Sequence, residues 1–166
     1  MTEKNVFEEN WALAQSTDYF DGDKMASDIF IKKYALRDKQ NRLYEATPDD
    51  MHRRLAREFA RVESKYPNPL TESEIYELLK GYKKVVAQGS PMSGIGNPYS
   101  VQSLSNCFVI EGAYDSYASI NRADDEMTAI MKRRGGVGHD LSRIRPKDMP
   151  VSNAAGSTDG LAVFMD

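Results

Sequence analysis

The sequence predicts a mixed α/β protein in which a mainly helical region is followed by a region of strand, helix and glycine-rich loop. One observation is that apolar residues recur at helical spacing in residues 48–66 and 71–87. Another is the abrupt change of composition after residue 88, where glycine, proline and serine become frequent. We therefore expect a helical domain with an irregular lead-in over residues 1–88 and a mixed domain over residues 89–166.

The composition excludes several classes of protein. The 166 residues carry a formal net charge of −3, whereas general nucleic-acid binders have a basic footprint. One cysteine cannot form an internal disulfide or supply a zinc ribbon. No apolar stretch approaches the ~18 residues of a membrane span, and the start has no apolar signal core. We expect a cytoplasmic protein whose partners include neither membranes nor nucleic acid.

Two helices of the first region have recognisable N-terminal signals. The first begins after Thr47, which can cap it, and Pro48 suits its first position. The second follows Thr71, and Glu74 stands at capping-box spacing from it. The chain before Thr47 is only weakly patterned, so we expect the irregular lead-in there.

The mixed region begins with a long loop. Residues 88–102 are rich in glycine, proline and serine, and loops of this length inside compact domains are often functional. Residues 106–110 are a short apolar run, which predicts a buried strand. A third helix is expected from about Asp115, and Gly135 and Gly136 would end it before a glycine-rich loop.

Cys107, the single thiol, allows two interpretations. A lone cysteine is most often a small buried core residue. Alternatively, Cys107 is a redox or hydrogen-donating thiol at the mouth of a sheet, beside a loop that can hold a ligand. Reactivity requires a perturbed pKa, which sequence does not reveal, so both interpretations stay open.

The glycine run and the charged residues near it are equally open. Residues 135–138 follow a helix and lack the lysine of a phosphate-binding loop, so they form either a tight turn or a backbone that approaches a ligand closely. Arg143 and Arg145 share one face of an extended segment, as a solvated pair or as a phosphate clamp. Asp115 is by default a helix cap and could also accept a hydrogen bond from a sugar hydroxyl.

The first helix carries several arginines away from its apolar stripe. We interpret them as a solvated face, with nucleic-acid contact as the alternative. The two histidines, His52 and His139, show no metal-ligand spacing, so we expect no metal site. The arginines on the solvated face of the first helix are Arg53, Arg54, Arg57 and Arg61.

Four motifs follow one another in the second half of the sequence. They are a Ser-Pro-Met loop from Ser90, SLSNCFVI over residues 103–110, DSYASI over 115–120 and RGGVGHDLSRIRPK over 134–147. Each motif alone is weakly specific, but the ordered set is specific. Together they resemble the catalytic chain of ribonucleotide reductase. The resemblance covers residues 89–166, and residues 25–88 resemble the helical N-terminal domain of that family less specifically.

The resemblance implies the N-terminal fragment of a longer chain that reduces ribonucleotides to deoxyribonucleotides. The α/β fold would be a helical N-terminal domain followed by the first one or two strands of a ten-stranded barrel. The cysteine that carries the thiyl radical, the second redox cysteine and the shuttle cysteines belong to later motifs of the family. We therefore expect the fragment to be inactive by itself.

The resemblance also implies roles for individual residues. Cys107 resembles the first member of a redox cysteine pair, which becomes a disulfide as the ribose 2′-carbon is reduced. The backbone of Gly135 and Gly136 resembles the stretch that passes close to the bound nucleotide. The residues expected to contact the phosphates and sugar of the substrate are Ser90, Ser105 and Asn106.

An allosteric specificity site is implied around the third helix. Asp115 would hold the deoxyribose hydroxyl of a deoxynucleoside triphosphate effector, and Arg145 would hold its phosphates. Ser116 and Lys147 belong to the same expected site, and residues 147–156 would form a mobile loop over the effector. ATP is the other expected effector. The helix from Asp115 would pair with its copy in a homodimer.

The resemblance favours adenosylcobalamin as the source of the radical, with its binding site outside these residues. The wording of the GGVG and SNC motifs favours this class, as does the short stretch before Cys107, which leaves no room for an ATP-cone domain. The alternative is a radical from a separate metal-containing small subunit. Expected partners are the ribonucleotide substrate, the remainder of the chain and a thioredoxin- or glutaredoxin-like reductant. The alternative function is a non-catalytic nucleotide-binding or regulatory fragment that keeps only the effector site.

Overall fold

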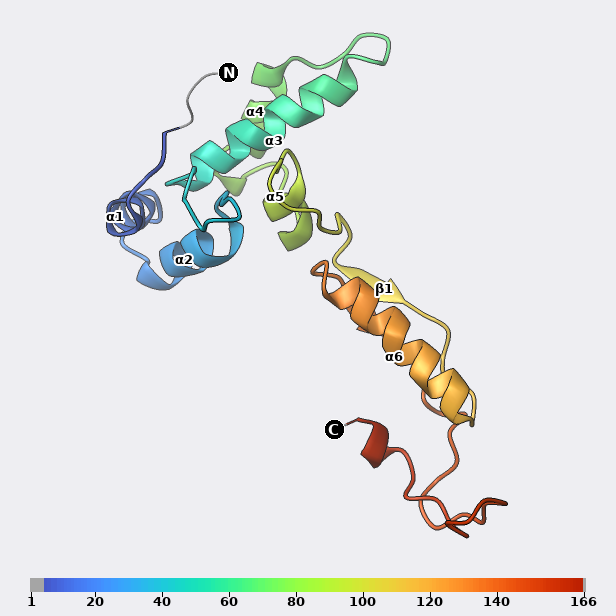
Figure 1. Cartoon of the computed structure of the whole chain (residues 1–166). Helices are drawn as coiled ribbons and strands as arrows, with labels where there is room; N and C mark the ends of the chain where they lie inside the picture. The colour runs from blue at the N-terminus through green and yellow to red at the C-terminus, as the bar shows by residue number, and fades with distance from the viewer. Residues whose placement is uncertain (1–4, 166) are drawn as a thin grey trace. The chain divides into compact units, whose positions relative to one another are not determined.

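The computed structural model describes residues 5–165, and the chain divides into two compact units, one ending at Leu104 and the other beginning at Ser105 (Figure 1). The division falls later than the boundary expected after residue 88, because residues 89–104 pack with the first unit. The helical elements of the first unit are α1 (Glu9–Tyr19), α2 (Lys24–Ile29), the π-helix η1 (Phe30–Tyr34), α3 (Pro48–Glu63), α4 (Glu72–Leu79), the 3-10 turn η2 (Lys80–Tyr82) and α5 (Gly89–Gly94).

The start of the first unit is helical, so the expectation of an irregular lead-in is wrong over residues 9–34. Glu8 caps α1, and its carboxylate accepts a backbone hydrogen bond from the first turn at 2.8 Å. Asp23 caps α2 in the same way, at 3.0 Å. α1 buries only small side chains such as Ala12, so it has no apolar stripe from which a helix could be predicted.

α3 confirms the first predicted helix, including its start. The carboxylate of Asp50 accepts a hydrogen bond from the Thr47 backbone at 3.0 Å, and Pro48 is the first helical residue. Met51 and Leu55 are fully buried at the centre of the core of this unit. The other buried apolar residues of the core are Ala12, Phe30, Ile31, Leu43, Ala46, Ala56, Ile75 and Leu79.

α4 begins as predicted and ends earlier. The Thr71 hydroxyl accepts a hydrogen bond from Glu74 N at 3.2 Å, which confirms the capping box. The helix was expected to continue to residue 87, but it stops at Leu79. Gly81 and Tyr82 have φ of +64° and +58°, and such left-handed residues cannot continue a right-handed helix. Figure 1 shows α4 returning beside α3.

One arginine of α3 contradicts the expected solvated face. Three of the four arginines, Arg53, Arg57 and Arg61, are exposed and paired with acids. For example, Arg53 Nε lies 2.9 Å from Asp49 Oδ2. Arg54 is only 7% exposed. Its Nε donates to Glu45 Oε1 at 2.6 Å and its Nη2 to Glu45 Oε2 at 3.1 Å. Arg54 is therefore a buried structural residue, because the carboxylate of Glu45 neutralises it inside the unit.

The stretch expected as a long loop contains the short helix α5. Arg54 Nη2 donates to Met92 O at 2.9 Å, and Nη1 donates to Ile95 O, so the buried guanidinium satisfies carbonyls at the end of this helix. Ser93 Oγ donates to Gln102 Oε1 at 3.1 Å and ties α5 to the chain that follows. Side chains of the first unit thus give order to a stretch that its composition marks as a loop.

The second unit contains the strand–helix–strand sequence β1 (Cys107–Val109), α6 (Tyr117–Met131) and β2 (Gly136–Gly138), followed by the 3-10 turn η3 (Ala162–Phe164). The two strands pair in parallel, with Phe108 opposite Val137. A parallel pair needs a long crossover connection, which α6 supplies. The glycine-rich stretch expected as a loop therefore contains a strand.

The strand predicted at residues 106–110 is present but not buried in this chain. Val109 is 91% exposed and Cys107 is exposed on the same face. Phe108 points to the other face, where it lies near Ile130 of α6. In the described residues this sheet has two strands, and only one of its two faces is covered.

The mixed class of helices with few strands is confirmed, while the ten-stranded barrel stays a prediction. The only sheet in the described part of the chain is the open pair β1–β2. No helix within residues 5–165 combines the length and the apolar character needed to cross a membrane.

Candidate functional site

The parallel pairing of β1 and β2 brings together five of the predicted substrate and redox residues. Cys107 stands opposite Gly136 in the ladder, and Gly136 N donates to Asn106 O at 2.6 Å. Ser105 directly precedes this contact and Gly135 follows the end of α6. Two motifs separated by a whole helix thus lie side by side.

The structure bears on the buried-core interpretation of Cys107, and the redox role stays a prediction. The thiol is exposed and free, so the buried core interpretation is wrong for this chain. The cause is that Cys107 lies on the uncovered face of the two-stranded sheet. An exposed thiol on a strand edge is accessible to a reaction partner.

Gly135 has a reason within the fold to be glycine. A Cβ at Gly135 would lie 2.5 Å from Ile130 Cγ2 and 2.8 Å from the ring of Phe108. At Gly136 it would lie 3.1 Å from Asn106 O. Close packing of α6 against β1 therefore accounts for Gly135 without a ligand.

Ser90 lies in the first unit. It belongs to α5 and is 6% exposed. Its predicted contact with substrate phosphates stays a prediction, and in the described chain its side chain is part of the packed surroundings of α5.

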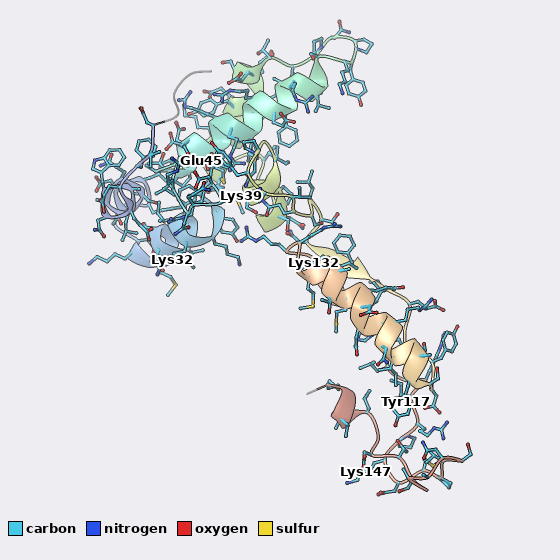
Figure 2. All side chains as sticks on the ribbon, viewed as in Figure 1. Lys32, Lys39, Glu45, Tyr117, Lys132 and Lys147 are labelled. Carbon is cyan, nitrogen blue, oxygen red and sulfur yellow. The ribbon has the colours of Figure 1, made fainter. Side chains whose placement is uncertain are left out.

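The predicted effector residues gather at the start of α6. Ser116 caps the helix, and its hydroxyl accepts a hydrogen bond from Ser119 N at 3.3 Å. Asp115, one residue earlier, is therefore released from capping and pairs with Arg145 Nε through Oδ2. The backbone N–H of Arg145 also donates to Asp115 Oδ1 at 3.4 Å. Figure 2 shows Tyr117 at this end of α6.

Asp115 and Arg145 line a cavity of about 320 Å³, which lies at the lower end of the size range of small-molecule sites. The lining comes from the start of α6, from Ile144 and Arg145, and from the segment between residues 151 and 163. The lining residues are Asp115, Ser116, Tyr117, Ile120, Ile144, Arg145, Val151, Ser152, Asn153, Ala155, Ser157, Thr158, Asp159, Gly160 and Val163.

Residues 148–160 form a hairpin-like segment that supplies much of the cavity lining. Asp148 N donates to Thr158 O at 2.8 Å, and Thr158 N donates to Met149 O at 3.0 Å. At its base, a Cβ at Gly160 would lie 2.7 Å from Lys147 N, and Gly160 has φ of +79°. This segment coincides with most of the loop expected over the effector, and its mobility stays a prediction.

Lys147, expected in the same site, lies outside the lining. Its side chain is exposed, and Figure 2 shows it where the hairpin-like segment begins. The effector role of Lys147 stays a prediction.

The clamp formed jointly by Arg143 and Arg145 stays a prediction, because the two arginines have different partners in this structure. The Arg143 guanidinium lies 4.7 Å from the ring centre of Tyr114, whereas Arg145 turns to Asp115. A turn precedes both arginines, in which Asp140 accepts hydrogen bonds from Ser142 N at 2.8 Å and Oγ at 2.9 Å. The backbone hydrogen bond from Ser142 lowers the pKa of Asp140, which favours the charged carboxylate that accepts the hydrogen bonds of this turn.

Sequence reasoning missed Asp159 and the polar residues of the hairpin-like segment. Asp159 contributes a second carboxylate to the cavity, and no partner for it is found within the described residues. A signal was present: Asn153 and Gly156 stand at turn spacing in a stretch of small polar residues. Within residues 5–165 no three His, Cys, Asp or Glu side chains are grouped so as to hold a metal ion.

Comparison with known families bears on the second unit. The family model "Ribonucleotide reductase, barrel domain" matches residues 105–166. The second unit is similar to the ribonucleotide reductase barrel domain. The matched segment begins at Ser105, where the second unit begins, and it includes Cys107, Asp115 and Arg145. No curated protein matches the chain. The match supports a fragment of a ribonucleotide reductase large chain.

Proposed function

We propose that this chain supplies part of the catalytic chain of a ribonucleotide reductase, with a redox cysteine at Cys107 and a deoxynucleotide specificity site at Asp115 and Arg145. The proposal is supported most by one observation. The segment similar to the reductase barrel domain is a unit of its own, and within that unit Asp115 and Arg145 line one cavity.

The redox role of Cys107 follows from the chemistry of ribonucleotide reduction. Two cysteine thiols supply two electrons and two protons, the ribose 2′-hydroxyl leaves as water, a C–H bond forms at C2′, and the thiols become a disulfide. A thiyl radical on a further cysteine starts the reaction by removing the 3′-hydrogen. Cys107 is one thiol of the pair in this proposal, and its exposure on β1 supports the assignment.

Neighbouring backbone supports a substrate next to Cys107. Gly136 and Gly138 leave the face of β2 beside the thiol without side chains, so a sugar can approach the backbone closely there. We propose that Ser105 and Asn106 contact the ribonucleotide from the start of β1. Ser90 is a further proposed substrate contact.

The specificity site is proposed to bind a deoxynucleoside triphosphate, or ATP, in the cavity at α6. A guanidinium binds phosphate oxygens in a fork geometry, and a carboxylate accepts a hydrogen bond from a sugar hydroxyl. Arg145 and Asp115 supply these two groups in one cavity. Ser116 adds a hydroxyl at the helix start, and Lys147 adds positive charge outside the lining.

Adenosylcobalamin is our proposed radical source, and a thioredoxin- or glutaredoxin-like protein is the proposed reductant. Adenosylcobalamin would supply the radical that generates the thiyl. No residue of this chain is assigned to the cofactor, and no step is derived through it. We also propose a homodimer through α6, whose ends expose Tyr117 and Met131.

A non-catalytic nucleotide-binding module is the second candidate. It is favoured by the fact that every lining residue of the cavity lies in the second unit, so binding requires no other part of a reductase. Both candidates predict nucleotide binding, and only the first predicts that Cys107 is needed for turnover once the remaining chain is supplied.

The test is calorimetric titration of the 166-residue chain with dTTP. The chain is expected to bind one dTTP, and Arg145→Gln is expected to lose most of this affinity while staying folded by circular dichroism. Arg143→Gln is the matched control, because Arg143 lies over Tyr114 and does not line the cavity. No heat of binding from a folded wild-type chain would contradict the specificity site.

A further inference from the structure

Arg145 is held on two sides in the cavity. Its Nε donates to the carboxylate of Asp115 at the start of α6, and its Nη1 donates to Pro150 O of the hairpin-like segment at 3.3 Å. No partner is found for Nη2 within the described residues. One side chain thus links the start of α6 to the hairpin-like segment, and only part of its guanidinium stays free to donate to a ligand.

The charges that line the cavity do not favour a polyphosphate as they stand. Arg145 brings one positive charge, whereas Asp115 and Asp159 bring two negative charges. Both carboxylate oxygens of Asp115 already accept hydrogen bonds from Arg145, so a sugar hydroxyl would have to compete with these contacts. A triphosphate that entered without changing these contacts would meet a neutralised arginine and two carboxylates.

We propose that Asp115 and Arg145 form an exchange gate: a polyphosphate binds by taking the guanidinium from Asp115, and this frees the carboxylate for a sugar hydroxyl. The inference rests on the proposed deoxynucleotide site and adds its regulation. The ion pair is about one-third exposed on both sides, so it is weak enough for a ligand to replace.

The gate couples the two halves of the ligand. A deoxynucleoside alone finds Asp115 occupied, and inorganic tripolyphosphate alone releases Asp115 without giving it a partner. Only a molecule that carries both groups satisfies both residues. A deoxynucleoside triphosphate is therefore expected to bind more tightly than the separate affinities of deoxynucleoside and tripolyphosphate predict.

The experiment compares tripolyphosphate binding by two variants of the full chain, at low ionic strength. Asp115→Asn removes the charge that holds Arg145, and the expected result is an affinity for tripolyphosphate about fivefold higher than wild type. Asp159→Asn is the matched control: it removes a carboxylate from the same lining, but that carboxylate has no contact with Arg145 in the described residues. Its expected gain is about twofold or less, from general electrostatics alone.

Equal gains in the two variants, or a loss of affinity in Asp115→Asn, would overturn the gate. A dTTP titration of the wild type separates this from the proposed function. If dTTP fails to bind while Asp115→Asn still gains affinity for tripolyphosphate, the gate stands as an anion gate and the effector assignment fails. If neither wild type nor Asp115→Asn binds tripolyphosphate, the gate is wrong, and the dTTP titration alone decides the proposed deoxynucleotide site.

A wild-type readout covers the case in which Asp115→Asn does not fold. The Arg145 Nε–H signal in a nitrogen-15 spectrum reports the partner of that group directly. The gate predicts that this signal shifts on addition of tripolyphosphate and that the Arg143 Nε–H signal does not. An unchanged Arg145 signal at saturating tripolyphosphate would contradict the exchange.

Discussion

Arg54 donates hydrogen bonds to both carboxylate oxygens of Glu45 inside the first unit, from Nε at 2.6 Å and from Nη2 at 3.1 Å. Its guanidinium also donates to the backbone carbonyls of Met92 and Ile95. Both side chains of the ion pair are less than a tenth exposed. The carboxylate also accepts a hydrogen bond from Leu36 N at 2.9 Å, so three segments of the first unit meet at one buried charge pair.

Loss of this arginine is expected to destabilise the first unit strongly. Arg54→Met leaves the Glu45 carboxylate buried without its partner, which typically costs about 3–5 kcal/mol. Urea unfolding measures the effect. Arg57→Met on the same helix is the control, because Arg57 is exposed and its Nε lies 3.8 Å from Glu72; it should change stability by about 0.5 kcal/mol or less. Similar losses in both variants would show that the buried pair has no special role.

Gly135 is expected to tolerate no side chain. In Gly135→Ala the new methyl group meets Ile130 and Phe108, and overpacking of this kind costs about 1–3 kcal/mol. Faster amide exchange at Gly136 and Ile110 would report the loosened strand pair, because both amides donate across it. Gly138→Ala is the control, since nothing lies within 4 Å of its added Cβ. Unchanged exchange in Gly135→Ala would contradict the close packing of α6 on β1.

The base of the hairpin-like segment is expected to control nucleotide affinity. Gly160 and Gly156 both have positive φ, +79° and +75°, so alanine at either position carries a similar backbone strain of about 1–2 kcal/mol. Only at Gly160 does the added Cβ also meet the backbone of Lys147. Gly160→Ala should therefore weaken dTTP binding more than Gly156→Ala does, measured by calorimetry. Equal affinities would mean that the segment's base does not shape the cavity.

His52 is expected to make the first unit less stable in mild acid. The imidazole is 2% exposed, its Nδ1 has no hydrogen-bond partner, and it packs edge-on against Tyr82. Burial lowers the pKa of His52 below its ordinary value, and the nearby Asp49 opposes this shift only partly. Its contribution to stability is therefore complete above the unfolded pKa of about 6.5 and is lost as the pH falls through the lower folded value.

Urea unfolding at about pH 7.5 and about pH 5.5 measures this dependence, since these values lie on either side of the unfolded histidine pKa. The wild type should lose stability between them, and His52→Gln should lose less. The carboxylates with lowered pKa, such as Glu58 and Glu74, change stability at lower pH and do not confuse the comparison. An equal loss in His52→Gln would assign the dependence to another group.

Local signals in the sequence were sufficient for some elements. Thr47 with Pro48, and Thr71 with Glu74, define helix starts because a cap depends on residues three or four positions apart. α1 and α2 were not predictable in this way, since their buried positions are few and small. The Glu45–Arg54 pair was also hidden, because the fold brings the buried carboxylate and guanidinium together and no local pattern marks either as a core residue.

The candidate site depended on long-range information. Asp115 and Arg145 are 30 residues apart, and only their resemblance to family motifs placed them in one site. The contact between them, the separate position of Arg143 over Tyr114, and the carboxylate of Asp159 all follow from how the chain turns after β2. No local pattern carries that geometry. The same holds for Cys107, whose exposure depends on which face of the sheet is covered.

The most direct test of the central claim is an amide-resolved titration of the 166-residue chain with dTTP. The account predicts saturable shifts concentrated at the start of α6, around Ser116, and across the part of the hairpin-like segment that lines the cavity, from Val151 to Gly160. It also predicts that the shifts disappear in Arg145→Gln. Saturable shifts centred elsewhere, or their persistence in Arg145→Gln, would contradict a nucleotide site at this cavity.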